Sequence, residues 1–413
     1  MRILLASLCS LLTGLLIALA PATAQKPAPL SNQAPCVFIL DGVALKNLRA
    51  RIASGSAREP SLDRLRADAD AAMKEPLLSV TEKDRNPPSG DKHDYMSLAP
   101  YWWPNPSKPG GLPYIRRDGE TNPEIQRVPD HKNFDRLMSD AHTLALAFYL
   151  FREERYAARA AELLRHWFLD PSSRMNPNLQ FAQAVLGHNE GRGTGLIETR
   201  AIGTVADAAG LLASSEAWTA GDQSALVDWC SHFLKWMLES NNGKDEAAAK
   251  NNHGTYYDVQ IVALAVFTGN RDLAERVLRE VPAKRIATQI EPDGSQPLEI
   301  ARTKSLSYSA FNLAAFFELA RLGDNVGVDL WDFQSKDGRS IRNALDFLVP
   351  FVAGEKQWTS PQIEKYNAAE IIPVLLAASD RYKSPAYREA SRKADPSAPQ
   401  SLAALLIAEK HAD

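Results

Sequence analysis

The chain is poor in the residues that build metal sites and disulfide frameworks. It has three cysteines among 413 residues, Cys9, Cys36 and Cys230, and none has zinc-ligand spacing. An H-E-x-x-H motif, a G-x-S-x-G motif and a D-x-D-x-D calcium loop are also missing. We therefore expect no metal and no cofactor. Cys36 and Cys230 either pair in a disulfide or stay as free thiols, one buried and one idle. Their spacing does not decide between these alternatives.

An excess of positive charge is also missing. The 47 lysines and arginines are balanced by 50 aspartates and glutamates, for a formal net charge of −3. A nucleic-acid binder is usually basic, so we expect no nucleic-acid partner. If the substrate is a polyanion, a local basic groove must attract it rather than the field of the whole protein.

Long apolar runs are confined to the N-terminus. Arg2 is followed by the apolar stretch 4–20 and by Pro21-Ala22-Thr23-Ala24, which offers an A-x-A cleavage site. This pattern predicts a signal peptide over residues 1–24. We expect a periplasmic or secreted protein that is free of the membrane after cleavage and acts as a monomer.

Period-two strands and clear internal repeats are scarce, whereas helical apolar spacing is frequent. The predicted helices are 61–74, two helices between 134 and 167, and 197–214, 222–240, 255–268, 271–280, 306–321, 340–353, 366–380 and 400–410. Short connections between them predict helical hairpins packed side by side. The expected fold is all-α, an α/α toroid forming an incomplete barrel of about six to seven hairpins. We divide the chain into a signal peptide (1–24), a leader (25–54), a catalytic toroid (55–395) and a C-terminal helix or tail (396–413).

Residues 84–130 form a long predicted loop that is rich in aromatic side chains, which argues for an ordered functional segment. Its candidate substrate-binding residues are Lys92, His93, Tyr95, Trp102 and Trp103. The two tryptophans either stack on sugar rings or plug the toroid.

A second candidate segment, 188–195, is rich in glycine but lacks the lysine of a phosphate loop. It offers His188, Asn189 and Arg192 as donors to a sugar. A purely structural glycine turn is the alternative.

The most informative pattern is Asn251-Asn252-His253, followed about fifty residues later by Arg302 and Tyr308. Arg302 and Tyr308 are six residues apart, so one continuous helix would put them on roughly opposite faces. We therefore expect Arg302 to precede a helix and Tyr308 to lie in its first turns, with Ser305 as the N-cap. A structural pair of Arg302 with Glu299 is the alternative.

These four kinds of side chain suit β-elimination in a polymer of uronic acids. An amide or guanidinium neutralises the carboxylate, a His or Tyr takes the neighbouring proton, and a Tyr protonates the departing oxygen. Arg302 would favour the Tyr308 anion, which makes Tyr308 a second candidate base beside His253.

The motifs together resemble the alginate lyase superfamily over residues 55–385. They are K-H-D-Y, A-P-Y-W-W-P, G-R-G-x-G, N-N-H and P-D-G-S-Q-P-L-E-I-A-R-T-K-S-L-S-Y-S. The order is similar to polysaccharide lyase family five and more similar to family thirty-eight, because the interval from Arg302 to Tyr308 is one residue shorter than in family five. The resemblance implies an α/α toroid and a lyase that cleaves uronate polymers such as alginate or glucuronan in carbohydrate degradation.

The resemblance also implies roles for single residues. His253 corresponds to a histidine that acts as base or assists it, and Tyr308 to the tyrosine that gives a proton to the leaving oxygen. Arg302 corresponds to the arginine beside that tyrosine. Asn252 corresponds to the amide that neutralises the carboxylate, and Asn189 is its rival. Asn251 and Glu299 complete the candidate substrate-binding residues.

Two other functions remain open at this point. A toroid glycoside hydrolase would need a carboxylate pair, for example from Glu190, Glu198 or Glu299. A non-catalytic protein would bind oligouronates without releasing an unsaturated end.

Overall fold

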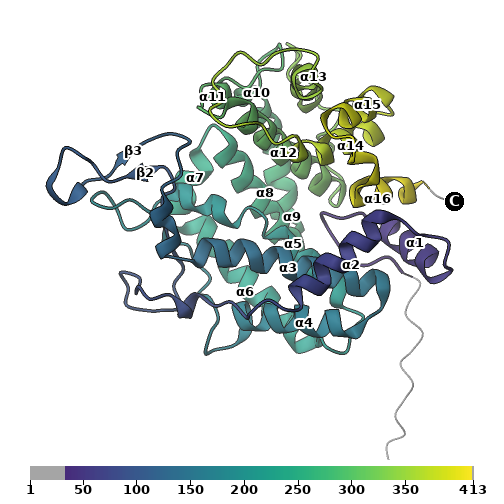
Figure 1. The fold of residues 1–413 in the computed structure, drawn as a ribbon, viewed down its shortest axis with the longest axis horizontal. Coiled ribbons are helices and arrows are strands. Elements are labelled where there is room, and N and C mark those ends of the chain that lie inside the picture. The colour runs from purple at the N-terminus through teal and green to yellow at the C-terminus, as the bar shows by residue number, and fades with distance from the viewer. Residues whose placement is uncertain (1–32, 412–413) are drawn as a thin grey trace, which may run out of the picture. The chain divides into compact units, whose positions relative to one another are not determined.

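Helices dominate the computed structural model, which describes residues 33–411 (Figure 1). The predicted signal peptide, 1–24, lies outside the described residues. The only regular strands within 33–411 are β1 (Met96–Leu98), β2 (Trp102–Trp103), β3 (Ile115–Arg116) and β4 (Phe181–Ala184). The expected all-α class is therefore confirmed.

The helices are, in chain order, α1 (Gly42–Ala53), α2 (Pro60–Ala72), α3 (Asp130–Phe151), α4 (Glu154–Leu164), α5 (Gly203–Leu212), α6 (Ala220–Glu239), α7 (Asn241–Ala248), α8 (Asn252–Phe267), α9 (Arg271–Val281), α10 (Ala287–Gln289), α11 (Pro297–Ile300), α12 (Ser305–Asp324), α13 (Ile341–Val352), α14 (Ile372–Arg381), α15 (Pro385–Ala394) and α16 (Leu402–Lys410).

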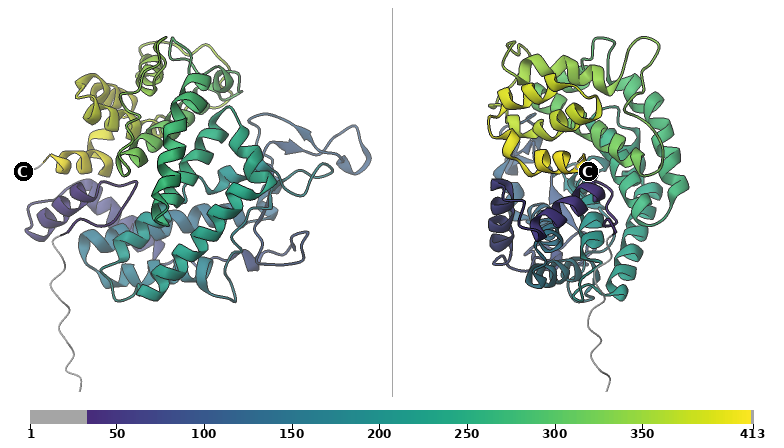
Figure 2. Two further views of the ribbon diagram at one scale, coloured as in Figure 1. Left: turned by 180° about the vertical axis from the view of Figure 1, so that it is seen from behind. Right: turned by 90° about the vertical axis from the view of Figure 1, so that its right-hand side faces the viewer.

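Successive helices pack into a closed cycle. The contacts run from α3 to α5, α8, α12, α14 and α16. From α16 the cycle returns through α1 to α3, so the first and last helices lie side by side (Figures 1 and 2). Helices α4, α6, α9, α13 and α15 pack against members of this cycle. This arrangement is the α/α toroid that the sequence predicted.

Helix α8 shows how sequence places a helix in this architecture. Most of its residues are buried, and its sequence, NHGTYYDVQIVALAVF, has no continuous polar face. Such a helix can only lie in the interior, where neighbours cover it on all sides. Helices α5, α6, α7, α9 and α12 all contact α8. Its N-terminus, which carries Asn252 and His253, is therefore held rigidly.

The aromatic segment 84–130 is ordered and carries three of the four strands. Strand β1 pairs in parallel with β4, and β2 pairs antiparallel with β3, so that Trp102 lies opposite Arg116. A buried ion pair ties the two ends of the segment together, with Lys83 Nζ 2.9 Å from Asp130 Oδ2. Asp130 Oδ2 also accepts a hydrogen bond from the main-chain N–H of Met96. The segment is thereby fixed across one end of the toroid.

The N-terminal part of the described chain differs from the expected loose leader. Residues 33–411 belong to one compact unit, and α1 packs against α3 and α16. The segment before α1 has no regular secondary structure. Instead, the side chain of Asp207 in α5 accepts the main-chain N–H groups of Phe38, Ile39 and Leu40 at 2.6–3.2 Å. The expected boundaries at 54–55 and 395–396 separate no structural units.

Most expected helices are present, with shifted ends. The helix expected from 197 begins at Gly203, because Gly193–Thr199 forms a 3₁₀ segment. The helix expected from 366 begins at Ile372, one residue before Pro373. The expectations omitted α1, α7, α10, α11 and α15. Cys36 is exposed and Cys230 is buried, and both thiols are free, so the disulfide alternative is wrong. None of the helices within residues 33–411 has the length and apolar character needed to cross a bilayer.

We predict that Asp207→Ala destabilises the protein by about 2–4 kcal/mol, because it leaves three partly buried N–H groups without an acceptor. Urea denaturation should show a lower midpoint. The matched control is Asp228→Ala, whose side chain is 73% exposed, and its free energy of unfolding should stay within about 0.5 kcal/mol. Equal midpoints for the two variants would contradict the structural role of Asp207.

Candidate active site

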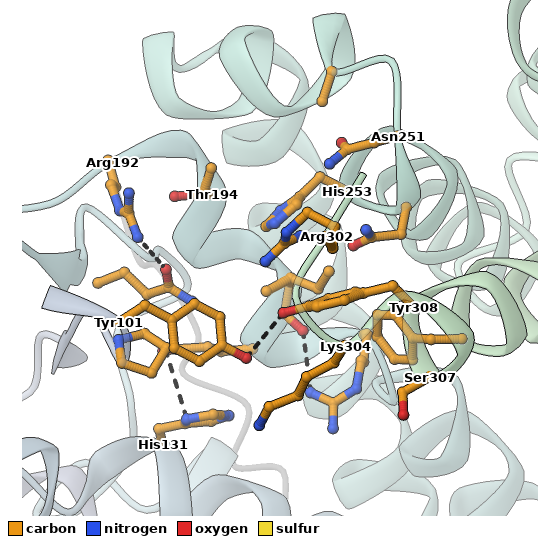
Figure 3. A pocket seen from close by; sticks show the side chains of 18 of the residues that line it. Tyr101, His131, Arg192, Thr194, Asn251, His253, Arg302, Lys304, Ser307 and Tyr308 are labelled. Carbon is orange, nitrogen blue, oxygen red and sulfur yellow. Dashed lines mark hydrogen bonds and ion pairs between the residues drawn. The ribbon is translucent and has the colours of Figure 1, made fainter. Parts of the chain in front are cut away.

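A cavity of about 580 Å³ lies between the β2–β3 hairpin, the glycine-rich segment and the first turns of α8 and α12. Seven of the sequence-predicted residues line it: Trp102, Arg192, Asn251, Asn252, His253, Arg302 and Tyr308. Figure 3 shows His253, Arg302 and Tyr308 converging on the same space from different elements. The cavity therefore joins the two motifs that are fifty residues apart in sequence.

His253 is the second residue of α8, and a carboxylate orients its imidazole. Its Nδ1 lies 2.6 Å from Oε1 of Glu246 in α7, and the Glu246 side chain is 1% exposed. An ionised carboxylate accepts hydrogen bonds and donates none, so Nδ1 carries the proton. The neutral ring then has an unprotonated Nε2 that can accept a proton. Glu246 was not among the sequence-predicted residues.

Arg302 and Tyr308 are arranged as the six-residue interval predicted. Arg302 lies in the turn after α11, and Tyr308 lies in the first turn of α12. The Arg302 Cζ is 3.8 Å from the centre of the Tyr308 ring. Helix α12 begins at Ser305 itself, and Lys304 occupies the N-cap position, so the expected N-cap is displaced by one residue. The Ser305 hydroxyl instead donates to the carbonyl of Pro361.

A carboxylate from the segment after β3 holds the Arg302 guanidinium. Nη2 is 2.8 Å from Asp118 Oδ1, and Nε is 3.0 Å from Oδ2. The structural alternative, a pair with Glu299, is therefore wrong. Burial opposes ionisation of Asp118, but the bonds from Arg302 prevail and lower its pKa to about 2.

The environment of Tyr308 differs from the expectation of an easily ionised phenol. Burial is the main effect and raises its pKa, and the hydroxyl of Tyr101, 2.9 Å away, raises it further. Arg302 lowers the pKa, but by less. This environment disfavours the phenolate, because desolvation outweighs one nearby cation, and it therefore runs against the expectation that Arg302 would make Tyr308 a base near neutrality.

The two adjacent asparagines have different surroundings. Asn252 is buried, and both its main-chain N–H and its Nδ2 donate to Glu299 at 2.7 Å. Glu299 lies beneath Asn252 and does not line the cavity, so it is not positioned to bind substrate. The side chain of Asn251 lines the cavity and has no hydrogen bond to any of residues 33–411.

The glycine-rich segment divides between two cavities. Arg192 and Thr194 line the cavity with His253. His188 and Asn189 line a different one, and Asn189 Oδ1 accepts from the N–H of Val185. Asn189 therefore shares no cavity with His253, and the rival assignment of the neutralising amide to Asn189 is wrong, as is the expected role of His188 in this cavity.

The aromatic segment contributes fewer residues to the cavity than expected. Tyr95 is fully buried and its hydroxyl donates to Glu198, so it is a core residue. Lys92 and His93 lie outside the cavity, and the ring of His93 bonds the carbonyl of Arg174. Of the two tryptophans only Trp102 lines the cavity; the Trp103 indole N–H donates to the carbonyl of Glu120.

Several cavity residues were not among the site residues predicted from the sequence. They are Tyr101, Arg116, His131, Gln183, Thr194, Arg200 and Lys304. Tyr101, Thr194 and Lys304 stood inside recognised motifs, namely A-P-Y-W-W-P, G-R-G-x-G and the motif that holds Arg302 and Tyr308; the other four come from distant segments that only the fold brings together. Within residues 33–411 no group of three His, Cys, Asp or Glu side chains is placed to hold a metal ion.

The carboxylates proposed for glycoside hydrolysis do not form a pair in this cavity. Of Glu190, Glu198 and Glu299 only Glu198 lines it. Glu198 Oε2 already accepts hydrogen bonds from the hydroxyls of Tyr95 and Ser97. A hydrolase needs an acid and a second carboxylate across the scissile bond, and these three residues do not supply that arrangement.

Comparisons with known proteins agree with this geometry. The family model described as alginate lyase matches residues 79–358. The crystal structure of an alginate lyase from Bacteroides ovatus is 37% identical, covers 90% of this chain and 99% of its own, and superposes with a TM-score of 0.85.

More distant structures share the fold. Alginate lyase A1-III from Sphingomonas species A1 is 17% identical, with a TM-score of 0.52 over 84% of this chain and 90% of its own. A variant of A1-III in complex with a tetrasaccharide is 16% identical, with a TM-score of 0.53 over 86% of this chain and 90% of its own. A comparison with curated proteins gives no match. The chain therefore belongs to the alginate lyase family of polysaccharide lyases.

Proposed function

We propose that this enzyme cleaves alginate by β-elimination, with His253 as the base and Tyr308 as the acid. The observation that supports this assignment is that His253, Arg302 and Tyr308 line one cavity. Alginate is the substrate named for the similar structures. Related polymers of uronic acids present the same reacting carboxylate.

Neutralisation of the carboxylate has to supply much of the rate, because removal of the adjacent proton turns a carboxylate into a dianion. One positioned donor to a developing oxyanion contributes roughly 3–4 kcal/mol. Asp118 engages Nε and Nη2 of Arg302, which leaves Nη1 as a donor. The Asn251 amide is a second donor that lines the cavity, and we assign the carboxylate to these two groups. The Asn252 amide donates to Glu299. This bond links the start of α8, next to Asn251, to α11, next to Arg302.

His253 is the better base because its geometry fixes the tautomer that accepts a proton. Glu246 accepts from Nδ1, so Nε2 is the free position. The imidazolium formed by proton transfer is stabilised by the same buried carboxylate. The electron pair of the broken C5–H bond forms the C4=C5 double bond, and the C4–O bond breaks.

Tyr308 is the better acid because burial keeps its phenol protonated. As the C4–O bond breaks, the hydroxyl gives its proton to the leaving oxygen. The phenolate then accepts a hydrogen bond from Tyr101 and faces Arg302, and both stabilise it until solvent returns the proton. The products are an unsaturated uronate end and a new free hydroxyl.

We predict that the wild-type protein, incubated with alginate, produces ultraviolet absorbance from the new C=C bond. Tyr308→Phe and His253→Ala should each reduce kcat by about 10²- to 10⁴-fold, the usual contribution of an acid or base. Circular dichroism and the thermal midpoint should show an intact fold.

Matched controls are available far from the cavity. Tyr382→Phe removes a hydroxyl that donates to the carbonyl of Trp331, and His232→Ala removes an exposed imidazole. Both should keep wild-type turnover. Full activity of Tyr308→Phe and His253→Ala would contradict the assigned residues, and a saturated product would favour the hydrolase.

The raised pKa of Tyr308 predicts the alkaline side of the pH profile. The acid must be protonated, so its contribution is present below its folded-state pKa and is lost only as the pH rises through that value. That value lies above about 10, the ordinary pKa of tyrosine. kcat should therefore not fall through ionisation of Tyr308 up to about pH 10. A decline in kcat that coincides with a phenolate absorbance near pH 8, and that is lost in Tyr308→Phe, would contradict the assignment.

We also propose that the enzyme is exported and acts in the periplasm or outside the cell. The support is the sequence of residues 1–24, with its basic start, apolar stretch and A-x-A site. Mass spectrometry of the protein from an expressing bacterium should show a chain that starts at Gln25. An intact N-terminus in the purified protein would contradict export by cleavage.

A further inference from the structure

A second group of polar side chains lies in the cavity and takes no part in the elimination. It consists of Arg192 and Thr194 from the glycine-rich segment and Gln183 from β4. Figure 3 shows Arg192 and Thr194 across the cavity from Tyr308. The group therefore lies beside the space in which the bond would be broken.

Arg192 is a largely buried cation without a carboxylate partner among residues 33–411. Its Nη2 donates to Gln183 Oε1 at 2.8 Å, and its buried Nε has no hydrogen-bond partner. Burial, followed by the nearby charge of Arg116, lowers the pKa of Arg192. Burying a cation without an anion is unfavourable, so an anion that enters this part of the cavity is bound favourably.

Other buried arginines of this protein show the contrast. Arg285 is 2.7 Å from Asp258, and its remaining donors bond main-chain carbonyls. Arg302 has a bidentate partner in Asp118. These two guanidinium groups thus have carboxylate partners, whereas that of Arg192 is open to the cavity.

The backbone holds Arg192 and Thr194 in place. They alternate with Gly191, Gly193 and Gly195, and a Cβ at these glycines would lie 2.1–2.7 Å from neighbouring atoms. The glycines therefore pack tightly against the protein while the side chains between them line the cavity. The Thr194 hydroxyl is buried and has no hydrogen-bond partner within the described part of the chain.

Gln183, which orients Arg192, has a strained backbone. Its φ is 50°, which is rare for a residue with a side chain. Its main-chain N–H donates to the Ser97 hydroxyl at 2.7 Å, and this bond holds the conformation. Strain of this kind persists where the surroundings enforce it, often beside a binding site.

We propose that Arg192 and Thr194 form a second carboxylate site, which binds the uronate unit next to the one that loses its proton. The guanidinium accommodates a carboxylate in a bidentate manner, and the threonine hydroxyl is a further donor. The enzyme then prefers polymers with a carboxylate on successive sugars over polymers in which uronates alternate with uncharged sugars. This inference rests on the proposed elimination at Tyr308.

The alternative is that Arg192 interacts electrostatically with the His253–Glu246 pair. Glu246 is among the charged groups that affect the pKa of Arg192. The two possibilities differ in kinetics. A carboxylate site contributes mainly to KM for substrates with a second carboxylate, whereas an effect on His253 changes kcat for every substrate.

The test compares Arg192→Gln and Thr194→Val with the wild type on two substrates, alginate oligosaccharides and the same oligosaccharides with part of their carboxyl groups reduced to alcohols. For Arg192→Gln we expect KM on the unmodified oligosaccharides to rise about 10- to 100-fold, the range for loss of a hydrogen bond to a charged group. kcat should change by less than about 3-fold. Thr194→Val should shift KM in the same direction by a smaller factor.

The reduced oligosaccharides supply the specific readout. The wild type should bind them more weakly, and Arg192→Gln should lose most of that discrimination. The control is Arg127→Gln, because Arg127 is 76% exposed and lies outside the cavity. The Arg127→Gln variant should have the same kcat and KM as the wild type.

The possible failures are distinguishable. If the wild type forms unsaturated product and Arg192→Gln keeps its KM, or loses kcat equally on both substrates, the second carboxylate site is overturned. If the wild type forms no unsaturated product from any uronate polymer, the proposed elimination itself is overturned.

Discussion

The bond between Asp118 and Arg302 is the interaction on which the rest of the site depends. Asp118 comes from the segment after β3, and Arg302 precedes α12, so one ion pair fastens the aromatic segment to the toroid. Asp118 also accepts from the main-chain N–H and the hydroxyl of Thr303. The result is a guanidinium fixed against the ring of Tyr308 with one nitrogen free. Without this anchor neither the cavity wall nor the orientation of Arg302 would be defined.

The charges of the molecule fall into two classes that follow from the cost of desolvation. Buried ions that support the fold have partners, as Lys83 has in Asp130 and Arg285 in Asp258. Along the cavity, Arg302 is paired with Asp118, whereas Arg192 and Arg200 have no carboxylate partner among residues 33–411 and favour an anionic ligand. A net charge of −3 is therefore compatible with a polyanionic substrate, because a local concentration of cations decides the attraction.

The ends of two helices add to this field. Helix α8 begins at Asn252 and α12 at Ser305, and both first turns border the cavity. No side chain of an N-cap residue caps either helix. Helix N-termini carry partial positive charge, which favours a negative ligand, and here Glu299 accepts the N–H of Asn252 and Gln362 accepts the N–H of Leu306. The toroid brings these two N-termini together, and each carries one partner of the proposed acid–base pair, His253 and Tyr308.

The sequence alone determined the helical class, the order of most helices and the side chains of the central cluster. Apolar periodicity and the six-residue interval suffice for that, because both are local properties, and so Arg302 and Tyr308 were placed correctly relative to α12. The tertiary structure alone decided which charges meet. Glu246 beneath His253, Asp118 on Arg302 and Tyr101 on Tyr308 are contacts between segments distant in sequence. Burial, which has no local signature, raised the pKa of Tyr308, placed Tyr95 in the core and left the Nε of Arg192 without a hydrogen-bond partner among the described residues.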